Sequence, residues 1–146
     1  MNIFSRIFKS KNKKTVETHL GVFTLVFSRG EKSIWNNTEN EFLISVRGTE
    51  AEPNSAQLEF IEHINIEISK LDTKITKRFT EEFKDADLEV DFNNWSERFK
   101  LVAVTVMLVF KEEGYWNITF EDLKKPYAHF TLYIEGEKTT DFSIDT

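Results

Sequence analysis

The sequence contains no cysteine and few residues that break regular structure, with five glycines and two prolines in 146 residues. The lack of cysteine excludes a disulfide framework, a thiolate metal site and a catalytic thiol. Apolar residues make up 40% of the chain and aromatic residues 14%, which is more than disordered chains carry. The length suits one domain, because two separate cores would each be small.

The one basic stretch of the chain lies at its start. The first 14 residues contain five Lys and Arg and no acid, so residues 15–146 carry 14 against 25 Asp and Glu, a net charge of −11. We interpret residues 1–14 as a basic amphipathic segment and residues 15–146 as a single α+β domain. The apolar residues of the segment recur at helical spacing: Ile3, Phe4, Ile7 and Phe8. This spacing allows a weak contact with anionic membranes, but a frayed or locally docked terminus is the simpler interpretation.

The acidic balance of the domain argues against nucleic-acid binding, because a surface that tracks phosphates needs a basic field. An export signal is not expected, since the N-terminal charges follow the apolar residues instead of preceding them. The longest apolar run, residues 101–110, is much shorter than the roughly 20 residues that a membrane-spanning helix needs. We therefore expect a cytoplasmic protein without a nucleic-acid partner and without membrane insertion.

Glycines separate runs of residues that favour strands. Gly30, Gly48, Gly114 and Gly136 each lie between two such runs, where a turn needs a positive φ angle. Gly21 lies inside a strand pattern, which indicates a bulge or a close backbone approach. Seven strands are predicted in two groups: 20–28, 33–36 and 41–47, then 98–111, 115–121, 128–135 and 139–144. The links within each group are short, so each group is predicted to be an antiparallel meander.

An apolar stripe at helical spacing lies between the two groups of strands. Its members recur every three or four residues: Ile61, Ile64, Ile68, Leu71, Ile75, Phe79 and Phe83. Asn54 is a candidate N-cap, and Gln57 three residues later completes a capping box. We predict one long helix over residues 55–84, unless Asp72 and Thr73 kink it. The order βββ-α-ββββ predicts an α+β fold, with an antiparallel sheet of about six to seven strands packed on one central helix.

Two of the predicted strands are apolar on both faces. Residues 115–121 and 128–135 alternate between apolar and polar side chains, which is typical of strands with one buried face. Residues 20–27 and 101–110 do not alternate, so both of their faces need a cover. One helix covers only one face. A homodimer or a protein partner is one candidate for the second cover, and the N-terminal segment and a curled sheet are the others.

The chain has none of the motifs that mark common catalytic and nucleotide-binding sites: GxGxxG, GxxxxGK[ST], HExxH and GxSxG are absent. No cofactor or metal site is expected. His129 shares a predicted strand face with Thr131 and Tyr133, and Asp122 or Glu121 nearby could orient its ring. The alternative function is therefore a small-molecule-binding or hydrolytic site around His129 and Asp122. Strand propensity explains the same residues as an ordinary solvent-facing sheet, and we favour that interpretation.

Two further features suggest partner binding. The first is an acidic run in which every second residue is charged: Asp85, Asp87, Glu89 and Asp91. An extended chain would place all four on one edge, as acidic inhibitors do towards basic active sites, although a solubilising surface is the more common role of such a run. The second feature is two tryptophans in polar surroundings, which can anchor a partner or cover the ends of the sheet. The two tryptophans are Trp35 and Trp95, and the predicted partner-binding set also contains side chains of the last strands: Tyr115, Thr131 and Tyr133.

Three stretches of the chain resemble a family of small uncharacterised bacterial domains. They are HLGVFTLVFSRGEKSIWNN, the FNNW that follows the predicted helix, and YWNITFEDLKKPYAHFTLYIEGEKTTDFSID. The family pattern is a "G-x-F" strand with a Trp, then a "D-x-x-x-x-x-H" turn and a final hairpin. Its matching positions in this chain are Gly21, Phe23, Trp35, Trp95, Asp122 and His129. The chain has Ala128 where the family carries a glycine before the histidine. The resemblance implies no activity, and in size and charge the family is similar to immunity proteins of bacterial toxin systems.

Four features favour a role in binding another protein. They are the acidic charge, the lack of catalytic motifs, the strands that are apolar on both faces, and the strand faces that carry polar and aromatic side chains. We expect a non-enzymatic bacterial protein-interaction domain. The specific hypothesis is an immunity-type protein that binds a toxin or another protein partner.

Overall fold

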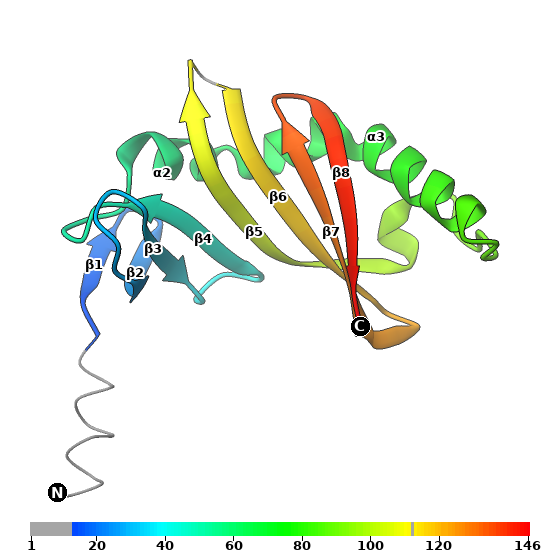
Figure 1. Cartoon of the computed structure of the whole chain (residues 1–146), viewed down its shortest axis with the longest axis horizontal. Coiled ribbons are helices and arrows are strands. Elements are labelled where there is room, and N and C mark those ends of the chain that lie inside the picture. Colours follow the sequence, from blue (N-terminus) through cyan, green and yellow to red (C-terminus); the bar gives the residue numbers. More distant parts are fainter. Residues whose placement is uncertain (1–12, 112) are drawn as a thin grey trace, which may run out of the picture.

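The computed structural model describes residues 13–111 and 113–146, and its strands form one sheet of eight in chain order (Figure 1). The strands are β1 (Thr15–Thr18), β2 (Gly21–Phe27), β3 (Ser33–Asn37), β4 (Leu43–Gly48), β5 (Phe99–Phe110), β6 (Glu113–Asp122), β7 (Lys125–Glu135) and β8 (Lys138–Asp145). The helices are α2 (Ser55–Glu62), α3 (Ile64–Asp85) and the short 3-10 helix η1 (Trp95–Glu97). The predicted α+β class is confirmed. The predicted strand number is wrong by one, because β1 adds an edge strand to β2.

The sheet consists of two antiparallel meanders joined by one parallel contact. Strands β1–β4 and β5–β8 each pair in sequence, as predicted. Between the groups, residues 43–45 of β4 pair in parallel with residues 103–105 of β5. The prediction of a fully antiparallel sheet is therefore wrong at this junction. The intervening helices form a crossover that returns the chain in its original direction, which is what a parallel pair requires.

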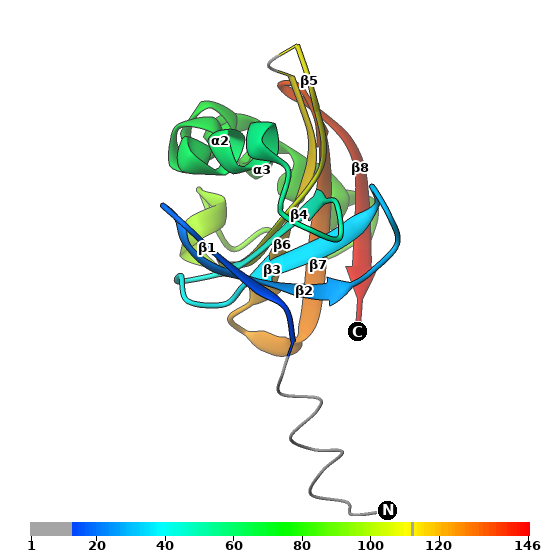
Figure 2. The same cartoon turned by 90° about the vertical axis from the view of Figure 1, so that its left-hand side faces the viewer.

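The helices lie together on one side of the sheet (Figures 1 and 2). The predicted single helix is broken at His63, whose φ and ψ of −106° and 16° end α2 and precede α3. Asp72 and Thr73 do not interrupt α3. Asn54 caps α2 as predicted, and its side-chain oxygen accepts from the Gln57 N–H at 3.0 Å. The Gln57 side chain does not complete a capping box, because it bonds to two strands instead.

The apolar stripe forms the core with the covered face of the sheet. Leu71, Ile75, Phe79 and Phe83 of α3 are buried together with Trp116, Ile118 and Phe120 of β6. Phe79 is the centre of an aromatic cluster, with ring centroids 4.1 to 5.7 Å from four other rings: Phe99, Phe120, Phe130 and Phe142. The alternation predicted for β6 and β7 is confirmed by their burial patterns.

Two bulges change the facing of side chains along β5. The register shifts between Leu101 and Ala103 and again between Val106 and Leu108. Because each bulge inserts one residue, the strand changes parity twice. The core face carries Phe99, Leu101, Val104, Val106 and Val109, so a strict two-residue alternation assigns several of these residues wrongly. The predicted apolar character of both faces persists at the end of β5, where Leu108 is 51% and Phe110 61% exposed.

Gly21 begins β2 at a φ of 109°, and a Cβ there would lie 2.9 Å from the Asn37 Nδ2 atom. The predicted close backbone approach is thus present. It lets Asn37, which is fully buried, donate to the Leu20 carbonyl at 3.1 Å.

Residues 1–12 of the predicted basic segment lie outside the described residues, so its proposed membrane contact stays a prediction. Within the described part of the chain, no helix has the length and apolar character needed to cross a bilayer.

Candidate functional site

The face of the sheet opposite the helices carries a continuous row of polar side chains. The register aligns one residue of every strand: Thr15, Thr24, Asn36, Ser45, Thr105, Asn117, Tyr133 and Asp141. A second row beside it contains Ala103, Thr119, Thr131 and Ser143. We call this surface the open face. Its hydroxyl, amide and phenol groups are held on strands, which position them more rigidly than loops would.

The open face brings together the residues predicted from the last strands. Tyr133 pairs with Asn117, and Thr131 pairs with Thr119, whose hydroxyl oxygen lies 3.1 Å from that of Thr131. Tyr115 lies on the same face, opposite Glu135. The charge of Glu135 and partial burial raise the pKa of the Tyr115 hydroxyl.

The centre of the open face is recessed. Ser45 is only 7% exposed, and the side-chain oxygen of Asn36 is buried without a hydrogen-bond partner in the described chain. Buried polar atoms are normally hydrogen-bonded. A ligand or partner that donates a hydrogen bond to the Asn36 oxygen would therefore bind more favourably.

His129 and Asp122 lie on opposite faces of the sheet. His129 pairs with Glu121 on the open face, whereas Asp122 points to the covered face, where it is 1% exposed. Asp122 therefore does not orient His129, which removes one of the two carboxylates considered for the hydrolytic alternative. Glu121 stays beside His129.

The two tryptophans in the predicted partner-binding set pack inside the molecule or against its helices. Trp35 is fully buried, and its indole N–H donates to the Thr49 carbonyl at 2.8 Å. Trp95 is partly buried over Phe120, and its indole N–H donates to the Asp72 carboxylate at 2.8 Å. Of the two roles considered for these tryptophans, the contacts with distant segments favour packing within the fold over anchoring a partner. Trp35 is therefore not available as a surface anchor, whereas Trp95 keeps a partly exposed ring.

The acidic run does not form one extended edge. Asp85 is the last residue of α3, and Asp87 has a φ of 55°, so the chain turns between them. Asp91 accepts hydrogen bonds from Arg98 and Lys124. Glu89 is exposed. The predicted row of four aligned carboxylates is therefore wrong, and one of the four charges is used within the molecule.

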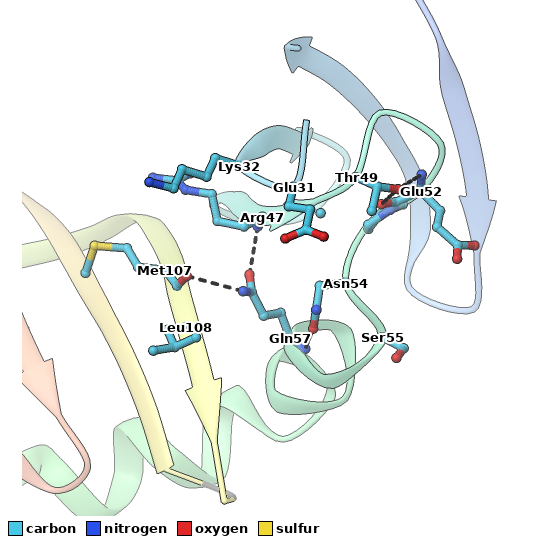
Figure 3. A pocket seen from close by; sticks show the side chains of 12 residues that line it. Glu31, Lys32, Arg47, Thr49, Glu52, Asn54, Ser55, Gln57, Met107 and Leu108 are labelled. Atoms are coloured by element: carbon cyan, nitrogen blue, oxygen red, sulfur yellow. Dashed lines mark hydrogen bonds between the residues drawn. The ribbon is translucent and has the colours of Figure 1, made fainter. Parts of the chain in front are cut away.

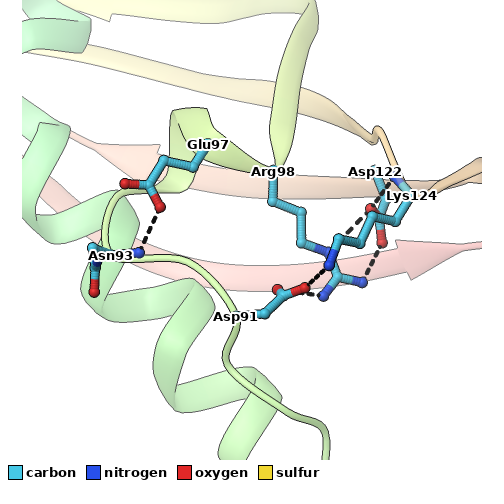
Figure 4. Close-up of polar contacts among 6 residues, drawn as sticks. All are labelled: Asp91, Asn93, Glu97, Arg98, Asp122 and Lys124. Atoms are coloured by element: carbon cyan, nitrogen blue, oxygen red, sulfur yellow. Dashed lines mark hydrogen bonds and ion pairs between the residues drawn. The ribbon is translucent and has the colours of Figure 1, made fainter.

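The most strongly coupled charges of the described residues join the loop after α3 to the hairpin between β6 and β7 (Figure 4). The Arg98 guanidinium donates to both oxygens of Asp122, at 3.1 and 2.8 Å, and to Asp91 at 2.8 Å. It also lies 4.9 Å from the centroid of the Phe83 ring. Lys124 adds a second cation at Asp91 and donates its backbone N–H to Asp122.

These contacts shift the pKa values of both carboxyl groups. Hydrogen bonds from Lys124 and Arg98 lower the pKa of Asp91 from 3.8 to about 2. Burial acts to raise the pKa of Asp122, but the hydrogen bonds from Arg98 and Lys124 outweigh it and hold the pKa below its usual value. The arrangement is a structural clamp, since every charge in it faces another charge of the same chain.

Because the pKa of Asp91 is lower in the folded than in the unfolded state, the free energy of unfolding depends on pH. The clamp stabilises the fold fully above the unfolded pKa, near pH 4, and the stabilisation is lost as the pH falls towards 2. Asp91→Asn removes the part of this stabilisation that depends on the Asp91 charge. The difference in unfolding free energy between wild type and D91N should therefore shrink between about pH 5 and pH 2. Urea unfolding at several pH values measures it, and a difference independent of pH would contradict this assignment.

A crevice opens where β4 and β5 diverge beyond their short parallel pairing (Figure 3). Gln57, which is 4% exposed, spans the gap: its side-chain oxygen accepts from the Arg47 N–H at 2.7 Å, and its amide donates to the Met107 carbonyl at 3.3 Å. The cavity has a volume of about 680 Å³, within the range of small-molecule sites. The sequence analysis missed it, because the pairing of β4 with β5 is invisible in a linear pattern. In the sequence, the place of Gln57 in the predicted capping box was the one feature that pointed to this region.

Among the described residues, no group of three or more His, Asp or Glu side chains is arranged to hold a metal ion. Comparison of the chain with protein-family models, with curated proteins and with solved structures found no match. The resemblance to small bacterial domains therefore stays an expectation from the sequence.

Proposed function

We propose that the chain is a non-enzymatic protein-binding domain that engages its partner through the open face. The observation that carries the proposal is the register, which aligns polar side chains across all eight strands on a face that none of the described helices covers. Tyrosines on a rigid sheet bury large area at a small entropy cost, which is typical of interaction hot spots.

Charge favours a basic partner. The chain carries a net charge of −6, and the part of the open face on β6 to β8 holds four carboxylates against one lysine, Lys138 opposite Glu135: Glu121, Glu135, Asp141 and Asp145. Complementary charge speeds encounter and disfavours wrong partners. An immunity-type protein that blocks a basic toxin fits this surface, and this is the specific form of the proposal.

The test has two stages. The tagged protein first captures a partner from the native lysate, and the affinity of the purified pair is then measured for Tyr133→Ala and Tyr115→Ala. Loss of a hot-spot tyrosine should weaken binding by roughly 10- to 100-fold. Lys77→Ala, on the exposed side of α3, is the matched control and should bind as wild type.

Circular dichroism and urea unfolding of each variant separate a binding defect from misfolding. If both tyrosine variants fold and bind like K77A, the partner uses another surface and the proposal is wrong. If the tagged protein captures only further copies of itself and forms a dimer in sedimentation equilibrium, the partner is a second copy of the chain and not another protein.

A further inference from the structure

The crevice between β4 and β5 carries two positive groups on one wall. Lys32 and Arg47 both line the crevice, and in the view of Figure 3 their side chains extend in the same direction, towards Met107. Among residues 13–111 and 113–146, neither the ammonium of Lys32 nor the guanidinium of Arg47 forms an ion pair or a side-chain hydrogen bond. Both groups therefore keep their donors available to solvent or to a ligand.

The acids of the crevice do not neutralise these two cations. In Figure 3 the Glu31 carboxylate lies on the other side of the Arg47 backbone from the two cationic groups, and Glu52 points away from them. No carboxylate of the described chain comes within 4.0 Å of either cation. Within the described part of the chain, these two cations are therefore available to an anionic ligand.

Apolar side chains lie next to the cations. Met107 is 37% and Leu108 51% exposed, and both line the crevice. Apolar side chains together with a few polar or charged groups are the usual composition of a small-molecule pocket. A ligand that is charged at one end and apolar beside it would satisfy both parts.

The walls of the crevice are held by the backbone. The Asn54 N–H donates to the Arg47 carbonyl at 2.9 Å, and the Thr49 N–H to the Glu52 carbonyl at 3.0 Å. A Cβ on Gly48 would lie 2.3 Å from the Glu52 oxygen, so the turn there is closed tightly on itself. With Gln57 bridging the strands, the cavity is preformed, which lowers the entropy cost of binding.

We propose that this crevice binds an apolar carboxylate, with the carboxylate between Arg47 and Lys32 and the apolar group on Met107 and Leu108. The planar guanidinium matches a carboxylate through two parallel hydrogen bonds. Partial burial lowers the pKa of Arg47, as expected for a cation that lacks a counter-charge and would gain one on binding. A free organic acid and the C-terminus of a peptide with an apolar last residue share this chemistry. The site adjoins the open face, because Arg47 lies two residues from Ser45 in β4 and Leu108 pairs with Tyr115, but the proposal does not require that a partner binds there.

Solution NMR on the full chain tests the site, with the Met107 methyl group, the Gln57 side-chain amide and the Arg47 Nε–H as reporters. The titrants are hexanoate, N-acetyl-glycyl-leucine with a free carboxylate, the same dipeptide as its amide, and inorganic phosphate. We expect saturable shifts at all three reporters with at least one of the two carboxylates, and none with the amide or phosphate. Binding of hexanoate alone identifies a free acid as the ligand type, and binding of the dipeptide acid alone identifies a peptide terminus.

The matched variants remove two positive charges each. Lys32→Gln with Arg47→Gln should weaken carboxylate binding at least tenfold, whereas Lys77→Gln with Lys84→Gln, on α3, should leave it unchanged. Unchanged backbone spectra outside the crevice establish that both variants fold. The proposal is overturned if neither carboxylate saturates, if the amide binds as well as the acid, if phosphate alone binds, or if the two double variants behave alike.

Discussion

Arg98→Met should lower the free energy of unfolding by about 3–5 kcal/mol, because it leaves the Asp122 carboxylate buried without its counter-charge. The side chains of Arg98 and Asp122 are 11% and 2% exposed, so water cannot replace the lost contact. Methionine keeps an unbranched stem over the Phe83 ring, which limits the loss of packing. Urea unfolding at pH 7, followed by tryptophan fluorescence, measures the change.

Two comparisons give this prediction its meaning. Arg78→Met removes a more exposed partner of Glu82 one helical turn away, and it should cost no more than about 0.5 kcal/mol. Adding Asp122→Asn to R98M removes the buried charge but keeps an oxygen for the Lys124 N–H, and it should recover more than half of the loss. A loss for R98M as small as that for R78M would show that the clamp does not support the fold.

Phe79→Ala should destabilise the protein by about 3–5 kcal/mol, the usual cost of removing a buried phenylalanine and leaving a cavity. Phe79 is fully buried, it stacks on Phe99, and it contacts three further rings edge to face. Its loss would remove the ring contacts that join α3 to strands β5 through β8 at the centre of the core. Thermal and urea unfolding provide the measurement.

Ile66→Ala is the matched control, since Ile66 belongs to the same helix but is 56% exposed. It should change stability by no more than about 0.5 kcal/mol. Phe79→Leu keeps most of the apolar volume and should cost clearly less than F79A. Equal effects of F79A and I66A would mean that α3 is not anchored through the aromatic cluster.

Local patterns determined most of the secondary structure. The three- and four-residue spacing of apolar side chains identified the helix, and the alternation in β6 and β7 identified strands with one buried face. Gly21 and Asn54 were recognisable because a close approach and a helix cap are each a property of a few neighbouring residues. Each of these signals depends on contacts within one element or its immediate turn.

The prediction of secondary structure was wrong where the local sequence pattern fits more than one structure. The apolar stripe continues without a gap across His63, so the periodicity alone could not show that the helix breaks there. The two bulges of β5 reverse the facing of its side chains, and an apolar run offers no alternation from which to detect them. β1 is a short edge strand, and only its pairing with β2 defines it.

The sequence by itself determined the fold class, the two meanders and the core face of most elements, because these follow from hydrophobic period and turn chemistry. The tertiary structure alone decided which polar residues meet. It buried Trp35, paired Asp122 with Arg98 and not with His129, and brought Lys32 and Arg47 to the same crevice. Such contacts join residues far apart in the chain, and they depend on the parallel junction of β4 and β5 and on sheet register, which no local pattern encodes.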